Sequence, residues 1–139
     1  MSYRLNFFLL LGLTLFVLAS AGCTQMNSSQ DAAAQSGDEV SVEQAYQKYE
    51  QGVFFLDIRT QEEWEEFHAP NTTHIPLNEL EKRSNELPMD EEIVVICRSG
   101  NRSQQGRDIL LSTGFEQVSS MAGGLRDWKA AGYPTVSGP

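Results

Sequence analysis

Two short apolar runs dominate the pattern of hydrophobic and polar positions along the chain. One covers residues 53–58, and the other consists of the four β-branched residues at 93–96. The second run is unbroken, which is typical of strands that are buried on both faces of a parallel sheet, and the first run is also predicted to be a strand. A further strand is predicted at residues 115–121, and a short extended segment at residues 74–77.

Helical signals lie between these strands. Two sequences, Ser41 to Gln44 and Thr60 to Glu63, have the spacing of capping boxes and predict helix starts. Further helices are predicted at residues 80–87, 103–111 and 125–131. The alternation of strand and helix predicts an α/β fold, in which a small parallel sheet carries helices on both faces and the crossovers are right-handed.

Cys97 directly follows the strand predicted at residues 93–96. A polar loop containing Gly100 comes next, and then a helix, which is the layout in which ligands bind beyond the carboxyl ends of strands. Inward-facing loop amides and a helix N-terminus favour an anion there, and Arg98 and Arg102 add positive charge. We therefore predict that Cys97 is a reactive thiolate on a solvent-facing loop; the alternative is an inert buried cysteine.

The sequence Cys-Arg-Ser-Gly-Asn-Arg-Ser at residues 97–103 resembles the active-site loop of the single-domain rhodaneses, which are sulfurtransferases. Residues 56–59 resemble the D-x-R strand end of that family, residues 62–64 the helix after it, and residues 67–77 its GHIPGA…IP segment. The C-terminal signature of the family is matched by Gly123, Gly124, Trp128, Gly132 and Pro134. The resemblance implies a rhodanese-like three-layer sandwich for a domain at residues 39–139.

The resemblance implies that Cys97 takes a sulfane sulfur from a small anionic donor such as thiosulfate and becomes a persulfide. The sulfur would then pass to cyanide, a thiol or a protein cysteine, with no metal or other cofactor. Donor binding is expected from the residues that follow the cysteine, namely Arg98, Ser99, Gly100, Asn101, Arg102 and Ser103. Asp57 and Arg59 are expected to brace neighbouring loops and not to react.

The family's glycine positions in the segment at 67–77 hold Phe67 and Asn71. Asparagine tolerates a left-handed backbone, whereas Phe67 is expected to change the shape of this loop. His68 and His74 lie in the same loop with no third ligand implied, so no metal site is predicted. Trp128 is expected to anchor the last helix in the core.

Three alternatives to a small-molecule sulfurtransferase are considered. Phosphatases and arsenate reductases of the same fold have one more residue between cysteine and arginine, so the spacing from Cys97 to Arg102 suits a single sulfur atom better. A non-catalytic binding module would not need Cys97 and its arginines. A persulfide carrier that serves a protein partner in the cell envelope fits the sequence equally well and stays open.

Charge narrows the set of partners. The chain has 10 basic and 19 acidic residues and a net charge of −9, which argues against a nucleic-acid partner. Against this acidic background, Arg98, Arg102 and Arg107 are expected to gather around the loop and draw in a small anion. We expect the domain to be a monomer.

The N-terminal residues predict export. Arg4, an apolar stretch and small residues at 20–22 have the order of a signal peptide, assigned to residues 1–22. Ala21-Gly22-Cys23 resembles a lipoprotein box in which Cys23 is lipidated, although Ser20 stands where leucine is usual. Residues 23–38 are polar and aperiodic and are expected to form a flexible linker. These features predict a bacterial envelope lipoprotein that faces the periplasm and touches the membrane only through its lipid; Thr24 after the cysteine favours the outer membrane.

Overall fold

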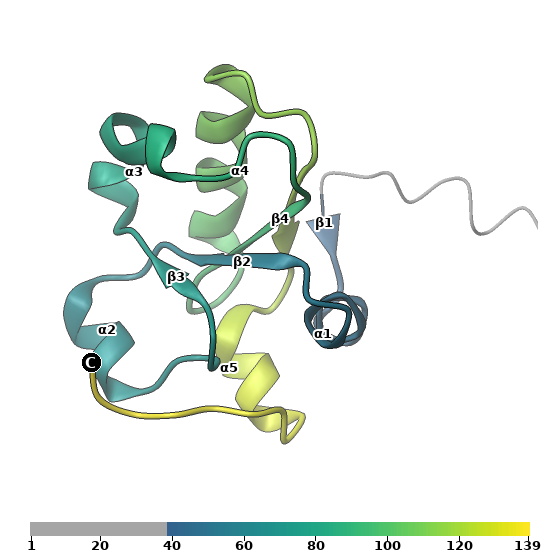
Figure 1. The fold of residues 1–139 in the computed structure, drawn as a ribbon. Helices are drawn as coiled ribbons and strands as arrows, with labels where there is room; N and C mark the ends of the chain where they lie inside the picture. Colours follow the sequence, from purple (N-terminus) through teal and green to yellow (C-terminus); the bar gives the residue numbers. More distant parts are fainter. Residues whose placement is uncertain (1–38) are drawn as a thin grey trace, which may run out of the picture.

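Five parallel strands form the centre of the fold in the computed structural model, which describes residues 39–139 (Figure 1). In chain order they are β1 (Glu39–Val40), β2 (Phe54–Asp57), β3 (Thr73–His74), β4 (Ile93–Ile96) and β5 (Val118–Met121). They lie side by side in the order β1-β5-β4-β2-β3, so β4 occupies the middle of the sheet. The predicted parallel sheet is confirmed, and β1 is a strand that the sequence pattern did not predict.

Helices cover both faces of this sheet. They are α1 (Val42–Glu50), α2 (Gln61–Glu66), α3 (Leu77–Arg83), α4 (Asn101–Ser112) and α5 (Gly124–Ala130), with a 3₁₀ turn at Ser84–Glu86. α3 and α4 lie on one side of the sheet, and α1 and α5 lie on the other (Figure 1). The predicted three-layer α/β arrangement is therefore confirmed.

The helix starts follow from local chemistry. Both predicted capping boxes are present, with Ser41 capping α1 and Thr60 capping α2. α4 begins two residues earlier than predicted, at Asn101, because Gly100 takes the left-handed conformation (φ 95°) at its N-cap. The cysteine loop is consequently short and enters α4 directly.

The alternation of side chains along β4 divides the core into two halves. Ile93 and Val95 pack with α3 and α4, whereas Val94 and Ile96 pack with α1 and α5. Trp128 is completely buried in the second half, as predicted, and its Nε1 donates to the carbonyl of Pro134 at 2.9 Å. Cys97 continues the series of Ile93 and Val95, so it lies on the α4 side of the sheet.

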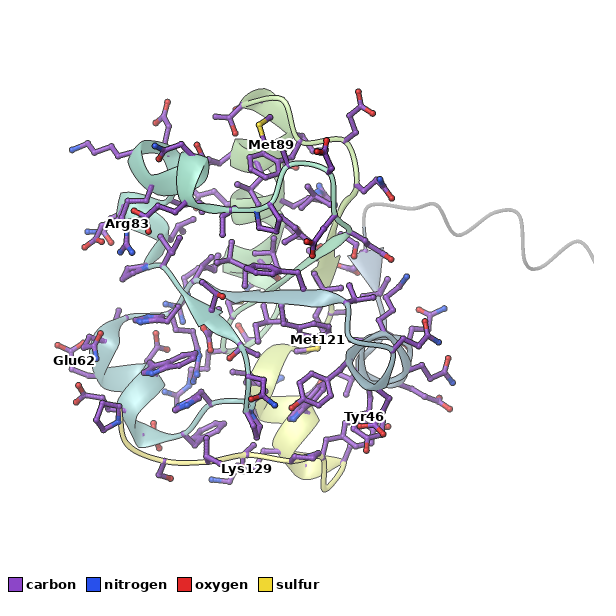
Figure 2. The ribbon with its side chains drawn as sticks, viewed as in Figure 1. Tyr46, Glu62, Arg83, Met89, Met121 and Lys129 are labelled. Carbon is purple, nitrogen blue, oxygen red and sulfur yellow. The ribbon has the colours of Figure 1, made fainter. Side chains whose placement is uncertain are left out.

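Tyr46 and Met121 mark the α1/α5 half of the core in Figure 2. The ring of Tyr46 stacks on Tyr133 with centroids 4.0 Å apart. On the opposite face, α4 approaches the sheet at Gly106, where an added Cβ would lie 2.8 Å from the Ile58 side chain and 3.0 Å from that of Val95. The glycine thus lets the helix that follows the cysteine loop lie close against β4 and against the residue that follows β2.

No helix within residues 39–139 has the length and apolar character needed to cross a membrane. The predicted signal peptide, Cys23 and the linker fall outside the described residues.

Candidate active site

Cys97 stands at the carboxyl end of the central strand, at the start of the loop into α4. Its side chain has no exposed surface, whereas its neighbours Arg98 and Ser99 are exposed. The backbone N–H of Gly100 donates to Cys97 Sγ at 3.2 Å. The loop faces solvent as predicted, but the thiol itself is buried, because the strand alternation turns residue 97 toward α4. A sulfur that receives an amide hydrogen bond at a helix N-terminus is placed to carry negative charge.

The start of α5 holds the backbone of this loop. The N–H of Leu125 donates to the carbonyl of Cys97 at 2.8 Å, and that of Arg126 donates to the carbonyl of Arg98 at 3.0 Å. Gly124 (φ 61°) makes this approach possible, since an added Cβ would lie 2.5 Å from the Cys97 carbonyl oxygen. The first two carbonyls of the loop, those of Cys97 and Arg98, are thus held by α5.

Ser103 fixes the other end of the loop. Its hydroxyl is fully buried and donates to the carbonyl of Gly100 at 2.6 Å, with the carbonyl of Met121 at 3.3 Å. An added Cβ on Gly100 would lie 2.9 Å from the amide nitrogen of Gly123. Of the loop residues that were predicted to bind the donor, Ser103 and Gly100 therefore shape the loop, whereas Arg98, Ser99 and Asn101 are exposed.

The two arginines of the loop differ in their surroundings. Arg102 donates from Nη1 and Nη2 to both carboxylate oxygens of Glu63, each at 2.7 Å. Arg98 is more than half exposed, and its Nη1 lies 3.8 Å from Glu63 and 3.9 Å from Glu66. Arg107 lies in the second turn of α4 and pairs with Asp108 at 2.8 Å. Of the three arginines that were expected to gather around the loop, Arg98 and Arg102 thus both lie within 4 Å of Glu63, and Arg102 is neutralised by it.

The sequence pattern does not predict Glu63 as a site residue; it marks Glu63 as a capping residue and as part of the family resemblance at residues 62–64. Its carboxylate serves both purposes, because it also accepts from the N–H of Thr60 at 3.1 Å. The hydrogen bonds from Arg102 hold the pKa of Glu63 at about 2, below its ordinary value of 4.5. The carboxylate is accordingly charged at every pH at which the protein is expected to work.

Asp57 and Arg59 form a buried ion pair beside the loop. Arg59 Nη2 donates to Asp57 at 2.6 Å, and neither side chain has more than about one hundredth of its surface exposed. Arg59 also donates to the carbonyls of Glu63 and Phe67, both at 2.8 Å. These contacts tie the end of β2 to α2. The Asp57–Arg59 pair therefore holds these two segments together.

The loop after α2 is held by an aromatic stack. The ring of Trp64 lies 3.7 Å from that of His68 and 4.7 Å from that of His74. Each imidazole donates to a backbone carbonyl, and no cluster of three metal-ligating side chains occurs in residues 39–139. Phe67 is extended (φ −169°) and so needs no glycine, and Asn71 is left-handed (φ 56°), as expected.

A cleft of about 470 Å³ opens beside the loop on the side of α3 and α4. Thr60, Leu77, Arg102 and Gln105 are among the residues that line it. Since Arg102 forms part of its wall, the cleft provides space for a ligand next to the cysteine loop.

A family model described as a rhodanese-like domain matches residues 41–131, which include β2, the cysteine loop and α5. YrkF of Bacillus subtilis (strain 168), a candidate sulfur carrier protein, is 41% identical over 104 residues, or 73% of this chain; the chain spans only 55% of the length of YrkF. Thiosulfate sulfurtransferase GlpE of Pseudomonas syringae pv. syringae is 35% identical, with 69% of this chain and 92% of GlpE covered. The crystal structure of a rhodanese-related protein from Thermoplasma volcanium has a TM-score of 0.67 at 28% identity and covers 72% of this chain and 98% of that one.

The contact between α5 and the loop generates a prediction about Gly124. Gly124→Ala and Gly132→Ala both place a side chain at a positive φ, but only at residue 124 would the new Cβ clash with the loop backbone. We expect Gly132→Ala to lower the free energy of unfolding by about 1–2 kcal/mol, and Gly124→Ala to lower it by roughly 1–3 kcal/mol more. Urea unfolding measures both values. Equal losses for the two variants would contradict the close approach.

The low pKa of Glu63 generates a second prediction. Because the pKa in the folded state, about 2, is below the ordinary value of 4.5, the charged carboxylate stabilises the fold fully above about pH 4.5. That contribution is lost as the pH falls from there toward 2. The difference in urea midpoint between the wild type and Glu63→Gln should therefore shrink as the pH is lowered across this range. A constant difference would show that the ion pair with Arg102 does not form in solution.

Proposed function

The chain belongs to the rhodanese family of sulfurtransferases, and from this membership we propose that it moves a sulfane sulfur from thiosulfate or a similar donor to a thiophilic acceptor through a persulfide on Cys97. The observation that carries the proposal is the hydrogen bond from the Gly100 amide to Cys97 Sγ at the end of the central strand. It provides a donor for an anionic sulfur at the place where the topology presents ligands to α/β sheets.

In the first step, the Cys97 thiolate attacks the outer sulfur of thiosulfate. A bond forms between Sγ and that sulfur, the sulfur–sulfur bond of the donor breaks, and its electron pair leaves with sulfite. The products are the Cys97 persulfide anion and sulfite, so the total charge is unchanged. Because Cys97 is buried, part of the structure around it must move for the donor to reach Sγ.

In the second step, a nucleophile such as cyanide, a thiolate or a protein cysteine attacks the outer sulfur of the persulfide. The bond to Sγ breaks, and the Cys97 thiolate is regenerated. Two chemical half-reactions on one enzyme group predict ping-pong kinetics. The Gly100 amide and the N-terminus of α4 stabilise the negative charge of both the thiolate and the persulfide. Arg98 is an exposed cation that can bind an anionic donor.

A persulfide carrier is the second candidate function. A carrier would load sulfur on Cys97 in the same way but deliver it to the cysteine of a protein partner. The similarity to YrkF favours this candidate. A phosphatase is disfavoured, because only four residues separate Cys97 from Arg102 and the loop is correspondingly narrow.

Persulfide formation can be tested directly. Intact-mass analysis after treatment with thiosulfate should show one added sulfur on the wild type and none on Cys97→Ser. The serine hydroxyl can accept the Gly100 amide bond, so the fold should persist, as circular dichroism will verify. Cys23→Ala is the matched control, since it removes the other cysteine of the sequence and must still gain the sulfur. Transfer activity that survives in Cys97→Ser would disprove the mechanism.

The location of the domain is a further part of the proposal. The signal-peptide pattern at residues 1–22, Cys23 and the polar linker support an envelope lipoprotein whose domain faces the periplasm. Two or more acyl chains on Cys23 would anchor it stably, whereas a single chain would be marginal.

Fractionation tests this location. We expect the wild type in the outer-membrane fraction and Cys23→Ala displaced from it, because the variant lacks the lipidation site. Incorporation of labelled palmitate should accompany the wild type alone. A soluble wild type that is processed in the same way as Cys23→Ala would indicate a plain secreted sulfurtransferase.

A further inference from the structure

We infer that Glu63 is a specificity-determining residue of this site, and that by holding Arg102 it adapts the site to the sulfur of a singly charged persulfide in preference to doubly charged thiosulfate. The inference rests on the proposed sulfur chemistry of Cys97 and narrows its donor. It is carried by the geometry of the Glu63–Arg102 pair and by the charges around the cysteine loop.

The Glu63–Arg102 contact is a complete two-point ion pair. Both carboxylate oxygens of Glu63 accept from Arg102 at 2.7 Å, and the Glu63 side chain is only 17% exposed. Glu63 is itself fixed, because its carbonyl accepts from the buried Arg59 and its carboxylate from the amide of Thr60. The negative charge is therefore built into the wall of the site and cannot swing away from Arg102 without breaking several contacts.

The surroundings of the loop add more negative charge. α2 carries four carboxylates, against the two arginines of the loop. The four are Glu62, Glu63, Glu65 and Glu66. Figure 2 shows Glu62 on the outer side of α2, and Arg98 lies within 4 Å of Glu63 and Glu66. A thiosulfate dianion would thus meet one exposed arginine that already has two carboxylates, Glu63 and Glu66, within 4 Å, and like charges at such distances disfavour binding.

A persulfide, R–S–S⁻, needs fewer free cations for binding at this site than thiosulfate does. Its single charge is on the terminal sulfur, which is the atom that must approach Cys97. The thiolate of Cys97 forms a bond to that sulfur, the bond to the donor's inner sulfur breaks, and the donor leaves as the thiolate R–S⁻. No dianion enters or leaves, so a second free cation is not required.

The variant Glu63→Gln removes the negative charge of residue 63 and keeps its hydrogen bond with the amide of Thr60. Glutamine is an accepted residue at this position of a capping box, so the amide of Thr60 keeps its partner while the charge on Arg102 is no longer neutralised. Glu62→Gln is the matched control, because it removes the same charge from the same helix at an exposed residue on the outer side of α2.

The experiment compares the steady-state kinetics of three proteins with three donors. The proteins are the wild type, Glu63→Gln and Glu62→Gln, and the donors are thiosulfate, 2-mercaptoethanol persulfide and a short lysine-containing peptide with a cysteine persulfide. We expect Glu63→Gln to lower the KM for thiosulfate by about 10-fold, as expected for one unmasked charge contact. The KM for 2-mercaptoethanol persulfide should stay within about twofold, and Glu62→Gln should resemble the wild type with both small donors.

An unchanged KM for thiosulfate in Glu63→Gln, or an equal improvement with thiosulfate and 2-mercaptoethanol persulfide, would overturn the inference. Failure of the wild type to form a persulfide with any donor would instead overturn the proposed function. A lower KM for the basic peptide than for 2-mercaptoethanol persulfide would support the inference and identify a protein as the source of the sulfur. Similar values for these two donors would support it and identify a small thiol.

If Glu63→Gln does not fold, a measurement on the wild type can test the inference instead. Sulfate is a dianion that cannot transfer sulfur, and its binding near the loop would slow the alkylation of Cys97 by iodoacetamide. We expect no protection at sulfate concentrations below about 10 mM, because a site of this charge should bind a dianion more weakly than that. Protection at lower concentrations would show that the site accepts dianions readily and would overturn the inference.

Discussion

The buried ion pair between Asp57 and Arg59 is the contact on which the site depends. Both side chains are almost fully removed from water, a state that is costly unless the remaining hydrogen-bonding groups are satisfied. Arg59 meets this requirement by donating to the carbonyls of Glu63 and Phe67. The pair therefore fixes α2 against the end of β2, and with α2 it fixes the carboxylate that holds Arg102. The Asp57–Arg59 pair at the end of β2 thus sets, through Glu63, the position of the Arg102 side chain on α4.

The cysteine loop is positioned by contacts distant in sequence. α5 donates amides to the carbonyls of Cys97 and Arg98, Ser103 ties the far end of the loop to β5, and Glu63 reaches it from α2. In a parallel sheet these segments converge because the carboxyl ends of β2, β4 and β5 share one edge. With the carbonyls of Cys97 and Arg98 bound by α5 and that of Gly100 by Ser103, the loop directs the Gly100 amide at the sulfur.

Local patterns predicted most of the fold and the identity of the loop. The apolar runs gave β2 and β4, the capping boxes gave α1 and α2, and Trp128 lies in the core as expected. The burial of Cys97 could have been predicted as well, because residues 93, 95 and 97 alternate onto the same face. The pairing of Glu63 with Arg102 could not, since the two are 39 residues apart and their contact depends on tertiary structure. For the same reason β1, with only two residues, could be identified only from its pairing with β5.

The pairing of Arg102 is compatible with sulfur transfer because the charge at the reacting position does not change. The thiolate and the persulfide each carry one negative charge, so the donors that stabilise one also stabilise the other. Phosphoryl transfer differs, because its substrate brings several negative charges that need several cations. A site that has only to support a constant single charge can use the Gly100 amide, the start of α4 and one exposed arginine. The second arginine is then available to join α2 to α4, which is where the structure places it.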